Sequence, residues 1–524
     1  MDDLMYLKSG TDIRGSAFST DGRPIDLTAE RLQSITWAFV NHLEQKISKF
    51  EDLKVAIGYD SRISSINIKM LISNVLAEMG VDVYDCGLSS TPSMFMSIIN
   101  HNMDAAIEIT ASHLPMEMNG LKFFTRDGGF SGDDIREILS KASNKKWLKD
   151  DFKANVKKLN NMGTYCEGLR EMIKKGVNAE DYEHPLKNLK IVIDPSNGVG
   201  GFYITDVLEP LGADTSGSVA VSPNGHFPTH QPNPENKAAM EAISQATTKA
   251  NADLGIIFDT DCDRSACVDK NGKPINRNRL VALASYIALK ECPGGIVVTD
   301  SVTSDGLTEF IETELGGIHR RFKRGYKNVI DEAKRLTFDE GNKAPLAIET
   351  SGHAAFLENY YLDDGAYLAT QIVILLASLR KQGKTLDDVL KNLKEPAEEC
   401  ETRIKIETDN FAEYGNSVLA SFKDFADNTD GIERVKLNFE GVKVNFDKEN
   451  GDGWLLLRLS LHEPLLVANC ESNSKGGTEK MLDKYRELEK ATGFKMKDIG
   501  FNEQSLVFYQ FVDCDIQGIP HFDN

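Results

Sequence analysis

The sequence has 524 residues, of which 41% are apolar and 8% aromatic, a composition typical of a globular protein with large buried cores. This length exceeds what one hydrophobic core supports and predicts about three to four domains. The net charge of −20 excludes nucleic-acid binding through a general basic surface, so an anionic ligand would need locally concentrated basic residues.

The cysteines and the apolar runs exclude further classes of protein. The 8 cysteines include no C-x-x-C pair and no zinc-ligand spacing, so neither a disulfide framework nor a zinc site is predicted. The N-terminus is acidic and lacks the apolar segment of a secretory signal. The most apolar long run, at 368–379, is too short to span a bilayer and predicts a buried helix. We therefore expect a cytoplasmic protein with no membrane or nucleic-acid partner.

Strands alternate with helices over the first three quarters of the chain, which predicts α/β units with mainly parallel sheets. Each strand is continuously apolar, as in a strand buried on both faces, and each ends in a loop that bears Asp. The strand and helix pairs are predicted at 53–60 with 68–79, at 189–196 with 238–250, and at 295–300 with 302–315. Boundaries between the units are predicted at 178–185, 292–294 and 394–399.

The last quarter of the chain has a different pattern. Residues 434–445 and 453–461 alternate like strands, 478–491 are periodic like a helix, and the stretch from Thr492 is predicted to be a tail. The predicted fold is α/β, with three tandem related α/β domains with mixed, mainly parallel sheets and a smaller C-terminal α+β domain. The predicted domains are residues 1–184, 185–293, 294–396 and 397–524.

Ser112 is the candidate phosphate carrier. It lies in a Thr-Ala-Ser-His-Leu-Pro loop after a short buried strand predicted at 105–107, and Lys122 follows close by. A hydrolase nucleophile paired with His113 is disfavoured, because no G-x-S-x-G elbow is present and adjacent side chains rarely face each other. An incidental loop serine is the other interpretation of this residue.

Three carboxylates at alternate positions, Asp259, Asp261 and Asp263, follow a strand predicted at 254–258 and can converge on a hard cation such as Mg²⁺. A calcium-binding EF-hand loop is excluded, since it needs Gly and Glu where this chain has Arg264 and Lys270. A solvated acidic loop is the remaining alternative. Arg264 suits either a phosphate or a salt bridge.

A glycine-rich segment at 198–201 superficially resembles a dinucleotide-binding fingerprint. The third glycine position is Tyr203, so the G-x-G-x-x-G pattern is broken. We interpret the segment as a turn between a strand and a helix.

Further loops predict a polyhydroxylated, phosphorylated ligand. Glu349, Ser351 and His353 follow a strand predicted at 346–348 and suit a sugar. Another loop, at 458–464, combines the guanidinium of Arg458 with polar side chains and is a plausible phosphate cradle. A basic Lys-Arg-Gly-Tyr-Lys loop lies at 323–327.

In this order, the motifs resemble those of the α-D-phosphohexomutase family, which includes phosphoglucomutases and phosphomannomutases. The resemblance runs from Ser-Gly-Thr-Asp-Ile-Arg-Gly at 9–15 to Pro464, which is most of the chain. It includes Gly-Tyr-Asp-Ser-Arg at 58–62 and the patterns T-A-S-H-x-P, D-x-D-x-D-R, E-x-S-G-H and R-x-S-x-x-E-P.

The resemblance implies four domains around a central cleft, each contributing one loop. Ser112 would be the phosphoserine and would hold Mg²⁺ together with Asp259, Asp261 and Asp263. Further catalytic residues, which assist proton transfer and stabilise charge, would be Arg14, Lys122 and His353. Substrate-binding residues would be Arg264, Lys323, Gly325, Tyr326, Glu349, Ser351, Arg458, Ser460 and His462.

Two positions depart from the family pattern. The last loop carries His462 where the family usually has Thr, and the residue before Glu349 is Ile where the family usually has Gly. A histidine can still donate a hydrogen bond, with an affinity for phosphate that then depends on pH near neutrality.

The expected activity is interconversion of hexose 1-phosphate and hexose 6-phosphate, of glucose and/or mannose, with Mg²⁺ as cofactor and hexose 1,6-bisphosphate as intermediate and activator. A phosphoglucosamine mutase is the nearest alternative. A sugar-phosphate hydrolase and a non-catalytic sugar-phosphate-binding protein are the others. Retention of Ser112 with all three aspartates favours the enzyme, because a binding module needs neither. The sequence predicts no oligomeric state.

Overall fold

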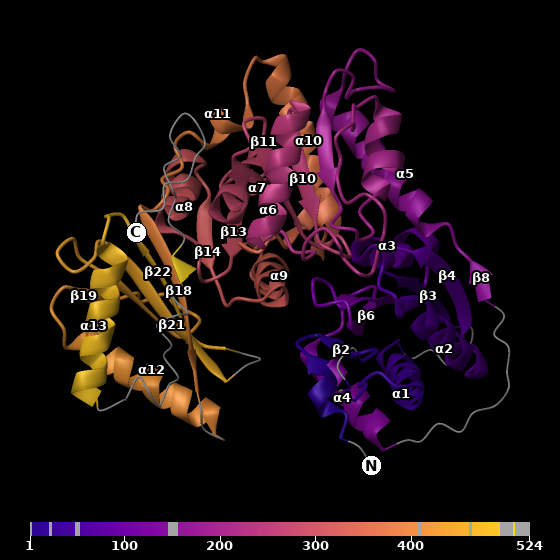
Figure 1. Ribbon diagram of the computed structural model, residues 1–524, viewed down its shortest axis with the longest axis horizontal. Coiled ribbons are helices and arrows are strands. Elements are labelled where there is room, and N and C mark those ends of the chain that lie inside the picture. The colour runs from indigo at the N-terminus through magenta and orange to yellow at the C-terminus, as the bar shows by residue number, and fades with distance from the viewer. Residues whose placement is uncertain are drawn as a thin grey trace. The chain divides into compact units, whose positions relative to one another are not determined.

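The computed structural model describes residues 3–19, 22, 24–47, 53–144, 156–406, 410–460, 464–492 and 507–508 (Figure 1). The chain forms two compact units. The first unit comprises Met1–Val297 and Ala333–Lys391, and the second unit comprises Val298–Glu332 and Asn392–Asn524. The chain first passes from one unit to the other within strand β13 (Ile296–Thr299).

The N-terminal sheet is mixed and has parallel strands at its centre. Its strand order is β1-β2-β6-β5-β3-β4-β8, with β7 paired to β6. Strands β3, β4, β5 and β8 run parallel, and β1, β2, β6 and β7 add antiparallel pairs. The strands are β1 (Lys8–Ser9), β2 (Asp12–Ser16), β3 (Lys54–Tyr59), β4 (Asp82–Leu88), β5 (Ala105–Ile109), β6 (Met118–Thr125), β7 (Gly128–Gly129) and β8 (Val156–Lys158).

Helices cover both faces of this sheet because its central strands are apolar on both sides. Along β3, Val55 and Ile57 join the core under α1 (Ala29–Ile47), α2 (Ser65–Glu78) and α4 (Gly132–Ser143). Ala56 points the other way and packs with α3 (Thr91–His101). The first domain is therefore an α/β/α layer structure, as predicted.

The second sheet of the first unit has the strand order β12-β11-β10-β9. Only β9 and β10 are parallel among its described strands. Helix α6 packs against one face through Ala239, Met240 and Ile243, and α10 contacts β10 and β11. The elements are β9 (Ile191–Asp194), α6 (Lys237–Ala250), β10 (Leu254–Phe258), β11 (Ser265–Asp269), β12 (Pro274–Ile275) and α7 (Arg277–Glu291).

The remaining part of the first unit begins at Ala333, within the last turn of α9 (Tyr326–Lys334). Strands β15, β16 and β17 form antiparallel pairs. The apolar run at 368–379 lies in a buried helix, which confirms that prediction. The elements are β15 (Leu346–Ile348), β16 (Ala354–Phe356), β17 (Leu362–Asp363), α10 (Gly365–Lys381) and α11 (Leu386–Leu390). Helix α5 (Asn161–Val177) packs against α10.

The second unit is built on a sheet with the order β19-β20-β21-β22-β18-β23. Along β21, Leu455 and Leu457 join the core with α12 and α13, whereas Trp454 and Leu456 pack against Val302 on the other face. The elements are β14 (Ile318–Arg321), α8 (Asp305–Glu309), β18 (Glu398–Lys405), α12 (Phe411–Asp427), β19 (Ile432–Arg434), β20 (Val442–Phe446), β21 (Gly453–Leu459), β22 (Leu465–Ser472), α13 (Gly477–Thr492) and β23 (Val507–Phe508).

Two predicted elements differ from the structure. The strand expected at 434–445 is interrupted by a loop between β19 and β20, where Gly441 adopts a positive φ of 55° and Asn438 donates to two backbone carbonyls. The helix expected at 302–315 begins only at Asp305, because the Ser304 side chain accepts a hydrogen bond from the backbone N–H of Leu307. A short π-helical turn at Phe310–Glu314 completes it.

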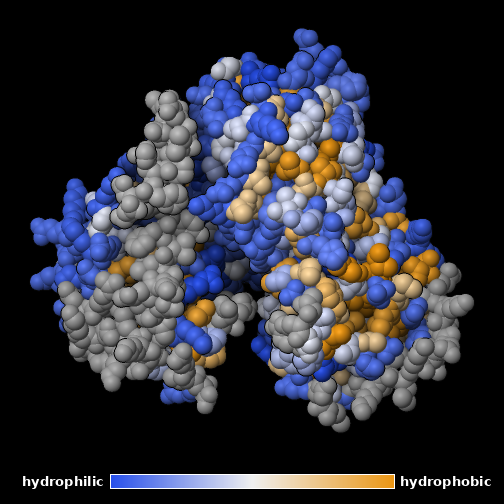
Figure 2. Space-filling model, viewed as in Figure 1, coloured by the Kyte–Doolittle hydropathy of each residue, from blue (hydrophilic) through white to orange (hydrophobic). Residues whose placement is uncertain are grey.

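Exposed apolar side chains gather on one part of the first domain. Ile63, Ile66, Met70 and Leu88 are exposed and lie on or beside α2 and β4. Figure 2 shows apolar surface over this part of the domain. Among the described helices, none is both long enough and apolar enough to cross a bilayer.

Candidate functional site

Ser112 lies in the loop between β5 and β6 and is 3% exposed. Its φ of 52° is in the left-handed region, which is sparsely populated by residues other than glycine. The Thr110 side chain stabilises this turn by accepting a hydrogen bond from the Ser112 backbone N–H at 2.8 Å. The loop therefore holds the Ser112 hydroxyl in one defined place.

Arg62 holds the same loop in place through its backbone carbonyls. Its side chain is fully buried and donates to the carbonyl oxygens of Ser112, Leu114, Pro115 and Met118 at 2.5, 2.6, 2.7 and 2.9 Å. Nε donates to Asp60 at 3.1 Å. Arg62 ends the Gly-Tyr-Asp-Ser-Arg motif, and the sequence predicted no role for it. The contacts identify it as a positioning residue for the serine loop.

The three predicted metal-binding carboxylates converge. One oxygen from each of Asp259, Asp261 and Asp263 lies within 4.8 Å of the others, and all three side chains are buried between β10 and β11. The approach of this loop requires Gly198, because a Cβ there would lie 2.4 Å from the carbonyl oxygen of Thr260. The glycine-rich segment therefore allows the acidic loop to pack closely against it.

This donor set fits a hard divalent cation. Asp261 Oδ1 and Asp263 Oδ1 are buried and have no hydrogen-bond partner among the described residues. Burial raises the pKa of Asp259 well above its ordinary value, and the neighbouring carboxylates of Asp263 and Asp261 raise it further. Close buried carboxylates with free oxygens are what a cation would stabilise, and oxygen donors suit Mg²⁺.

Two cationic side chains flank the carboxylates. Lys122, on β6, donates to Asp261 at 2.9 Å and to Asp263 at 2.5 Å. Arg264 donates through Nε to Asp259 at 3.2 Å. Burial alone would raise the pKa of Asp263, but Lys122, together with His353 and Arg264, holds it below its ordinary value. The site therefore combines concentrated negative charge with fixed positive charge around Ser112.

The Ser112 hydroxyl sits at the meeting point of these groups. Its Oγ donates to Asp259 Oδ2 at 3.1 Å and accepts from Arg264 Nη2 at 3.3 Å. It also lies 3.2 Å from His113 Nδ1, so these adjacent side chains do meet, contrary to expectation. Burial and the charges of Arg264 and Arg14 lower the pKa of His113 to about 2, so its imidazole stays neutral. A neutral imidazole with this pKa is a poor general base, which argues against a hydrolase-like pair.

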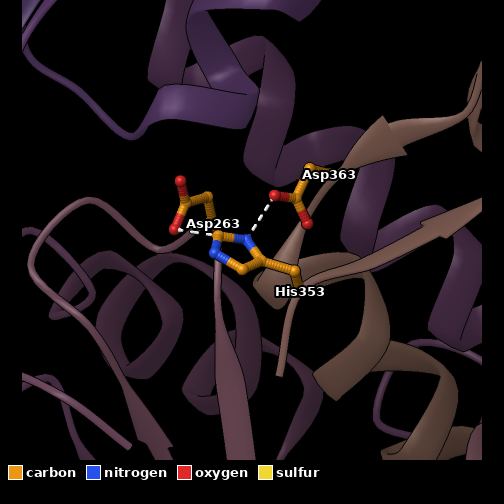
Figure 3. Close-up of side chains that lie close together, drawn as sticks. All are labelled: Asp263, His353 and Asp363. Atoms are coloured by element: carbon orange, nitrogen blue, oxygen red, sulfur yellow. Dashed lines mark hydrogen bonds and ion pairs between the residues drawn. The ribbon is translucent and has the colours of Figure 1, made fainter. Parts of the chain in front are cut away.

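His353 lies between two carboxylates (Figure 3). Its Nδ1 hydrogen-bonds Asp363 and is 3.9 Å from Asp263 Oδ1. Burial lowers its pKa, but the carboxylates of Asp363 and Asp263 outweigh burial and raise the pKa to about 9. His353 is therefore an imidazolium at neutral pH. It can donate a proton or stabilise negative charge.

The sequence did not predict that Asp363 belongs to the site. It lies on the short strand β17, ten residues after His353 in the chain. The Asp-Asp-Gly sequence at 363–365, just before a helix, was the available signal. Asp364 takes a structural part, because it caps α10 and accepts a hydrogen bond from the Tyr165 hydroxyl at 2.7 Å.

The predicted sugar loop packs beside the acidic loop. Glu349 and Ser351 are buried at the turn between β15 and β16, and Ser351 Oγ lies 3.4 Å from Glu349 Oε2. Gly352 has a φ of 95° and allows close contact, since a Cβ there would lie 2.6 Å from the carbonyl oxygen of Ser265. Arg264 and His353 pair directly through their backbones.

Arg14 is also in the first unit. It lies on β2 opposite Gly120 of β6 and forms a 2.7 Å ion pair with Asp12. Its charge acts on the His113 ring. The structure thus brings together in the first unit the predicted residues Arg14, Ser112, Lys122, Asp259, Asp261, Asp263, Arg264, Glu349, Ser351 and His353.

The other predicted residues belong to the second unit. Lys323, Gly325 and Tyr326 lie in or beside the loop before α9, and Gly325 has a φ of 112°. Arg458 lies on β21 and Ser460 directly after it. His462 lies outside the described residues, so its predicted role stays a prediction.

Comparison with known proteins agrees with the resemblance of the motifs. Residues 7–149, 164–272 and 276–396 match the phosphoglucomutase/phosphomannomutase α/β/α domains I, II and III, respectively. The phosphoglucomutase of Neisseria gonorrhoeae is 25% identical over 434 residues, which is 83% of this chain and 88% of that protein. A probable phosphoglucosamine mutase of Pyrococcus horikoshii is 28% identical over 442 residues, 84% and 90% of the two chains.

A solved structure is similar over nearly the whole chain. It is a phosphoglucomutase/phosphomannomutase family protein from Burkholderia thailandensis, with a TM-score of 0.74, 25% identity, and coverage of 96% of this chain and 99% of that one. The predicted three tandem α/β domains with mixed sheets are confirmed, and a C-terminal region rich in β-structure follows them; the described strand pairs are, however, more often antiparallel than parallel. The chain therefore belongs to the phosphoglucomutase/phosphomannomutase family, and it is an enzyme of the isomerase class.

Proposed function

We propose that the protein interconverts hexose 1-phosphate and hexose 6-phosphate, of glucose and/or mannose, through a phosphate carried on Ser112. The observation that carries the proposal is the setting of the Ser112 hydroxyl. It lies 3.1 Å from a carboxylate oxygen of Asp259 and 3.3 Å from a guanidinium nitrogen of Arg264. A carrier of phosphoryl groups needs both charge neutralisation and fixed placement, and these contacts supply them.

In the first half of the proposed reaction, the free hydroxyl oxygen of a bound hexose monophosphate bonds to the phosphorus on Ser112. The bond between phosphorus and Ser112 Oγ breaks, and the proton of the sugar hydroxyl ends on Ser112 Oγ. The product is a bound hexose bisphosphate. After this intermediate turns around, its other phosphate returns to Ser112 by the same steps in reverse. No water or second substrate is consumed, so the net reaction is an isomerisation.

The chain's own residues have distinct parts in this scheme. Arg264 and Lys122 offset the charge of the phosphoryl group, while Asp259, Asp261 and Asp263 would hold Mg²⁺. Mg²⁺, when bound, neutralises the phosphate oxygens as the phosphoryl group moves. His353 donates a proton or stabilises charge as an imidazolium, which its pKa of about 9 supports. Arg62 holds the serine loop still.

Glu349 and Ser351 are proposed to bind sugar hydroxyls. Arg458 and Ser460, with Lys323, Gly325 and Tyr326, are proposed to bind the phosphate that is not being transferred. Hexose 1,6-bisphosphate would also serve as activator, because it can load an unphosphorylated Ser112.

A phosphoglucosamine mutase is the second candidate, and the 28% identity to a probable enzyme of that kind favours it. Glucose, mannose and glucosamine differ at C2. A hydrolase and a non-catalytic sugar-phosphate-binding protein are the candidates of other classes.

Phosphorus NMR tests the proposal. The purified protein would be mixed with Mg²⁺, trace hexose bisphosphate and, separately, the 1-phosphates of glucose, mannose and glucosamine. We expect conversion to the 6-phosphate, abolished in Ser112→Ala and retained in the control Ser140→Ala, whose side chain is exposed on α4. Release of inorganic phosphate would identify a hydrolase. Binding without turnover would identify a non-catalytic protein.

A further inference from the structure

Glu440, in the loop between β19 and β20, contacts both predicted substrate-binding loops of the second unit. Its Oε2 accepts hydrogen bonds from the Ser301 hydroxyl at 2.6 Å and from the backbone N–H of Arg324 at 3.0 Å. Its Oε1 lies 3.8 Å from Arg458 Nη1. One carboxylate therefore reaches the basic loop at 323–327 and the guanidinium on β21.

The contact with the basic loop is made to the backbone, so it fixes the path of the chain there. The backbone N–H of Arg324 stands between Lys323 and Gly325, which are both predicted to bind substrate. Gly325 has a φ of 112°, a conformation that few other residues adopt. A carboxylate bonded to the preceding amide holds this turn in place.

The contact with Arg458 is electrostatic. Arg458 is 9% exposed, and its Nε has no hydrogen-bond partner among the described residues. Burial lowers the pKa of Arg458, the charge of Arg324 lowers it further, and the carboxylate of Glu440 acts in the opposite direction. At 3.8 Å, Glu440 offsets the guanidinium charge without taking a hydrogen bond from it. Among the described residues, no group accepts a hydrogen bond from the Arg458 Nε, which suits a residue that binds an anion.

The loop that carries Glu440 is itself rigidly held. A Cβ at Gly441 would lie 2.1 Å from the carbonyl oxygen of Leu457, so the loop runs directly against β21. Phe439 packs against Phe322, with ring centroids 4.9 Å apart, and beneath the Arg320 guanidinium at 4.2 Å. The loop that carries Glu440 is therefore packed against β21 and against residues that precede the basic loop.

We propose that Glu440 is a positioning residue that couples the two loops, so that the basic loop and Arg458 form one preassembled grip for the phosphate that is not transferred. This inference rests on the proposed function. Glu440 would not touch the substrate but would hold in place the residues that bind it. Preassembly lowers the cost of ordering side chains and loops when a ligand binds. Losing it should raise KM and leave kcat nearly unchanged, because the chemistry at Ser112 does not involve Glu440.

Two substitutions of Glu440 separate its hydrogen bonds from its charge. Glu440→Ala removes both. Glu440→Gln keeps an oxygen that can accept from Ser301 and Arg324 but removes the charge beside Arg458. Ser301→Ala deletes one of the two hydrogen bonds from the other side. Glu433→Gln, at an exposed position on β19, is the matched control.

Two readouts apply to each variant. Steady-state kinetics with glucose 1-phosphate give KM and kcat. Amide hydrogen exchange gives the protection of 323–327 against that of β20, and it needs no activity. For Glu440→Ala we expect KM to rise about tenfold or more, kcat to change less than about threefold, and exchange at 323–327 to quicken about tenfold.

Glu440→Gln should restore the protection of the basic loop to within about twofold of the wild type, and Glu433→Gln should match the wild type throughout. Ser301→Ala should show a smaller effect, about threefold, that does not add to that of Glu440→Ala, because both act through the same contact. If Glu440→Ala fails to fold, Ser301→Ala still decides the matter by its exchange.

The coupling would be overturned if amides at 323–327 exchanged as slowly in Glu440→Ala as in the wild type. It would also be overturned if Glu440→Ala and Glu440→Gln lost protection equally. A fall in kcat without a change in KM would do so too. A wild-type protein that does not turn over hexose phosphates would refute the proposed function instead, while the exchange measurement would still decide whether Glu440 holds the loop.

Discussion

Arg62 and Arg458 both have buried guanidinium groups, but the two groups differ in how many of their donors are hydrogen-bonded. Arg62, in the first unit, donates to four backbone carbonyls of the serine loop and to Asp60. Arg458, in the second unit, leaves its Nε without a partner among the described residues and has Glu440 only at 3.8 Å. The donors of Arg62 thus hold a loop in place, whereas the unpaired Nε of Arg458, among the described residues, suits a role in ligand binding.

Two buried histidines also differ between the units, in their charge. His353, in the first unit, is charged because Asp363 and Asp263 outweigh the effect of its burial. His319, in the second unit, hydrogen-bonds Thr299 and Thr308 at 2.8 and 2.7 Å, and burial, with Arg321 and Lys443 nearby, lowers its pKa well below the ordinary value. The first unit thus keeps a buried histidine charged by pairing it with two carboxylates, whereas the second unit keeps a buried histidine neutral beside two cations.

The largest effect is expected at the acidic loop. Asp261→Asn should lower kcat by about 1,000-fold, because the cation that offsets phosphoryl charge loses a ligand. In thermal melts, Mg²⁺ at 100 times its Kd should stabilise the wild type by about 2.7 kcal/mol and the variant much less. Asp133→Asn, at an exposed position, is the control. Full activity and an unchanged response to Mg²⁺ in Asp261→Asn would remove this site from the account.

Arg62→Met should lower the free energy of unfolding by about 3–5 kcal/mol, because Asp60 is left buried without its partner. Denaturant unfolding measures it. The exposed Arg136→Met should change stability by less than about 0.5 kcal/mol. A loss as small as that of the control would show that Arg62 does not organise the serine loop.

Asp363→Asn should lower kcat by about 10–100-fold, as expected when the partner that orients a reacting group is removed. The asparagine oxygen can still accept the hydrogen bond that the Ala354 backbone N–H donates to Asp363 at 3.0 Å, so the fold should persist. Steady-state kinetics, with circular dichroism to check folding, decide this. Wild-type kcat would mean that His353 acts without Asp363.

Arg458→Met is the counterpart of Arg62→Met and should behave differently. We expect the free energy of unfolding to fall by less than about 1 kcal/mol or to rise, since a buried charge without a close partner is removed. KM for the sugar phosphate should rise about tenfold or more, because a charge-assisted contact with phosphate is lost. Equal destabilisation by the two substitutions would show that Arg62 and Arg458 do not differ in this way.

The last expected effect concerns pH. Below the ordinary histidine pKa of about 6.5, His319 is protonated in the unfolded protein but stays neutral in the folded protein. The free energy of unfolding of the wild type therefore rises with pH in that range and falls as the pH is lowered. His319→Gln should flatten the pH dependence by up to about 1.4 kcal/mol per pH unit below 6.5. Denaturant unfolding from pH 4.5 to 7.5 measures both slopes. Parallel slopes would show that His319 is not held neutral.

The parts of the site that lie in one stretch of sequence were predictable. Asp259, Asp261 and Asp263 are alternate residues after a buried strand, so local geometry alone brings them together. Ser112 was predictable for the same reason, as a small hydroxyl on a loop directly after a strand. These local patterns also gave most strands and helices, because apolar periodicity reports burial directly.

Contacts between distant segments were not predictable. Asp363 reaches His353 from a two-residue strand that has no periodicity to detect. The carbonyl oxygens bound by Arg62 carry no side-chain signal at all. At 434–445 the alternation of apolar residues predicted one strand, but Gly441 and the side chain of Asn438 form a turn there, and that turn carries Glu440.

Phosphate transfer through Ser112 can be followed directly by peptide mass spectrometry of the wild type during a single turnover. The protein would be loaded with hexose 1,6-bisphosphate and Mg²⁺, freed of excess ligand, and then mixed with glucose 1-phosphate. We expect one phosphate on Ser112 before mixing; after one turnover that phosphate should be on the sugar product and the sugar's original phosphate on Ser112, with no inorganic phosphate formed. Turnover with Ser112 never phosphorylated, or loss of its phosphate to water, would contradict the account.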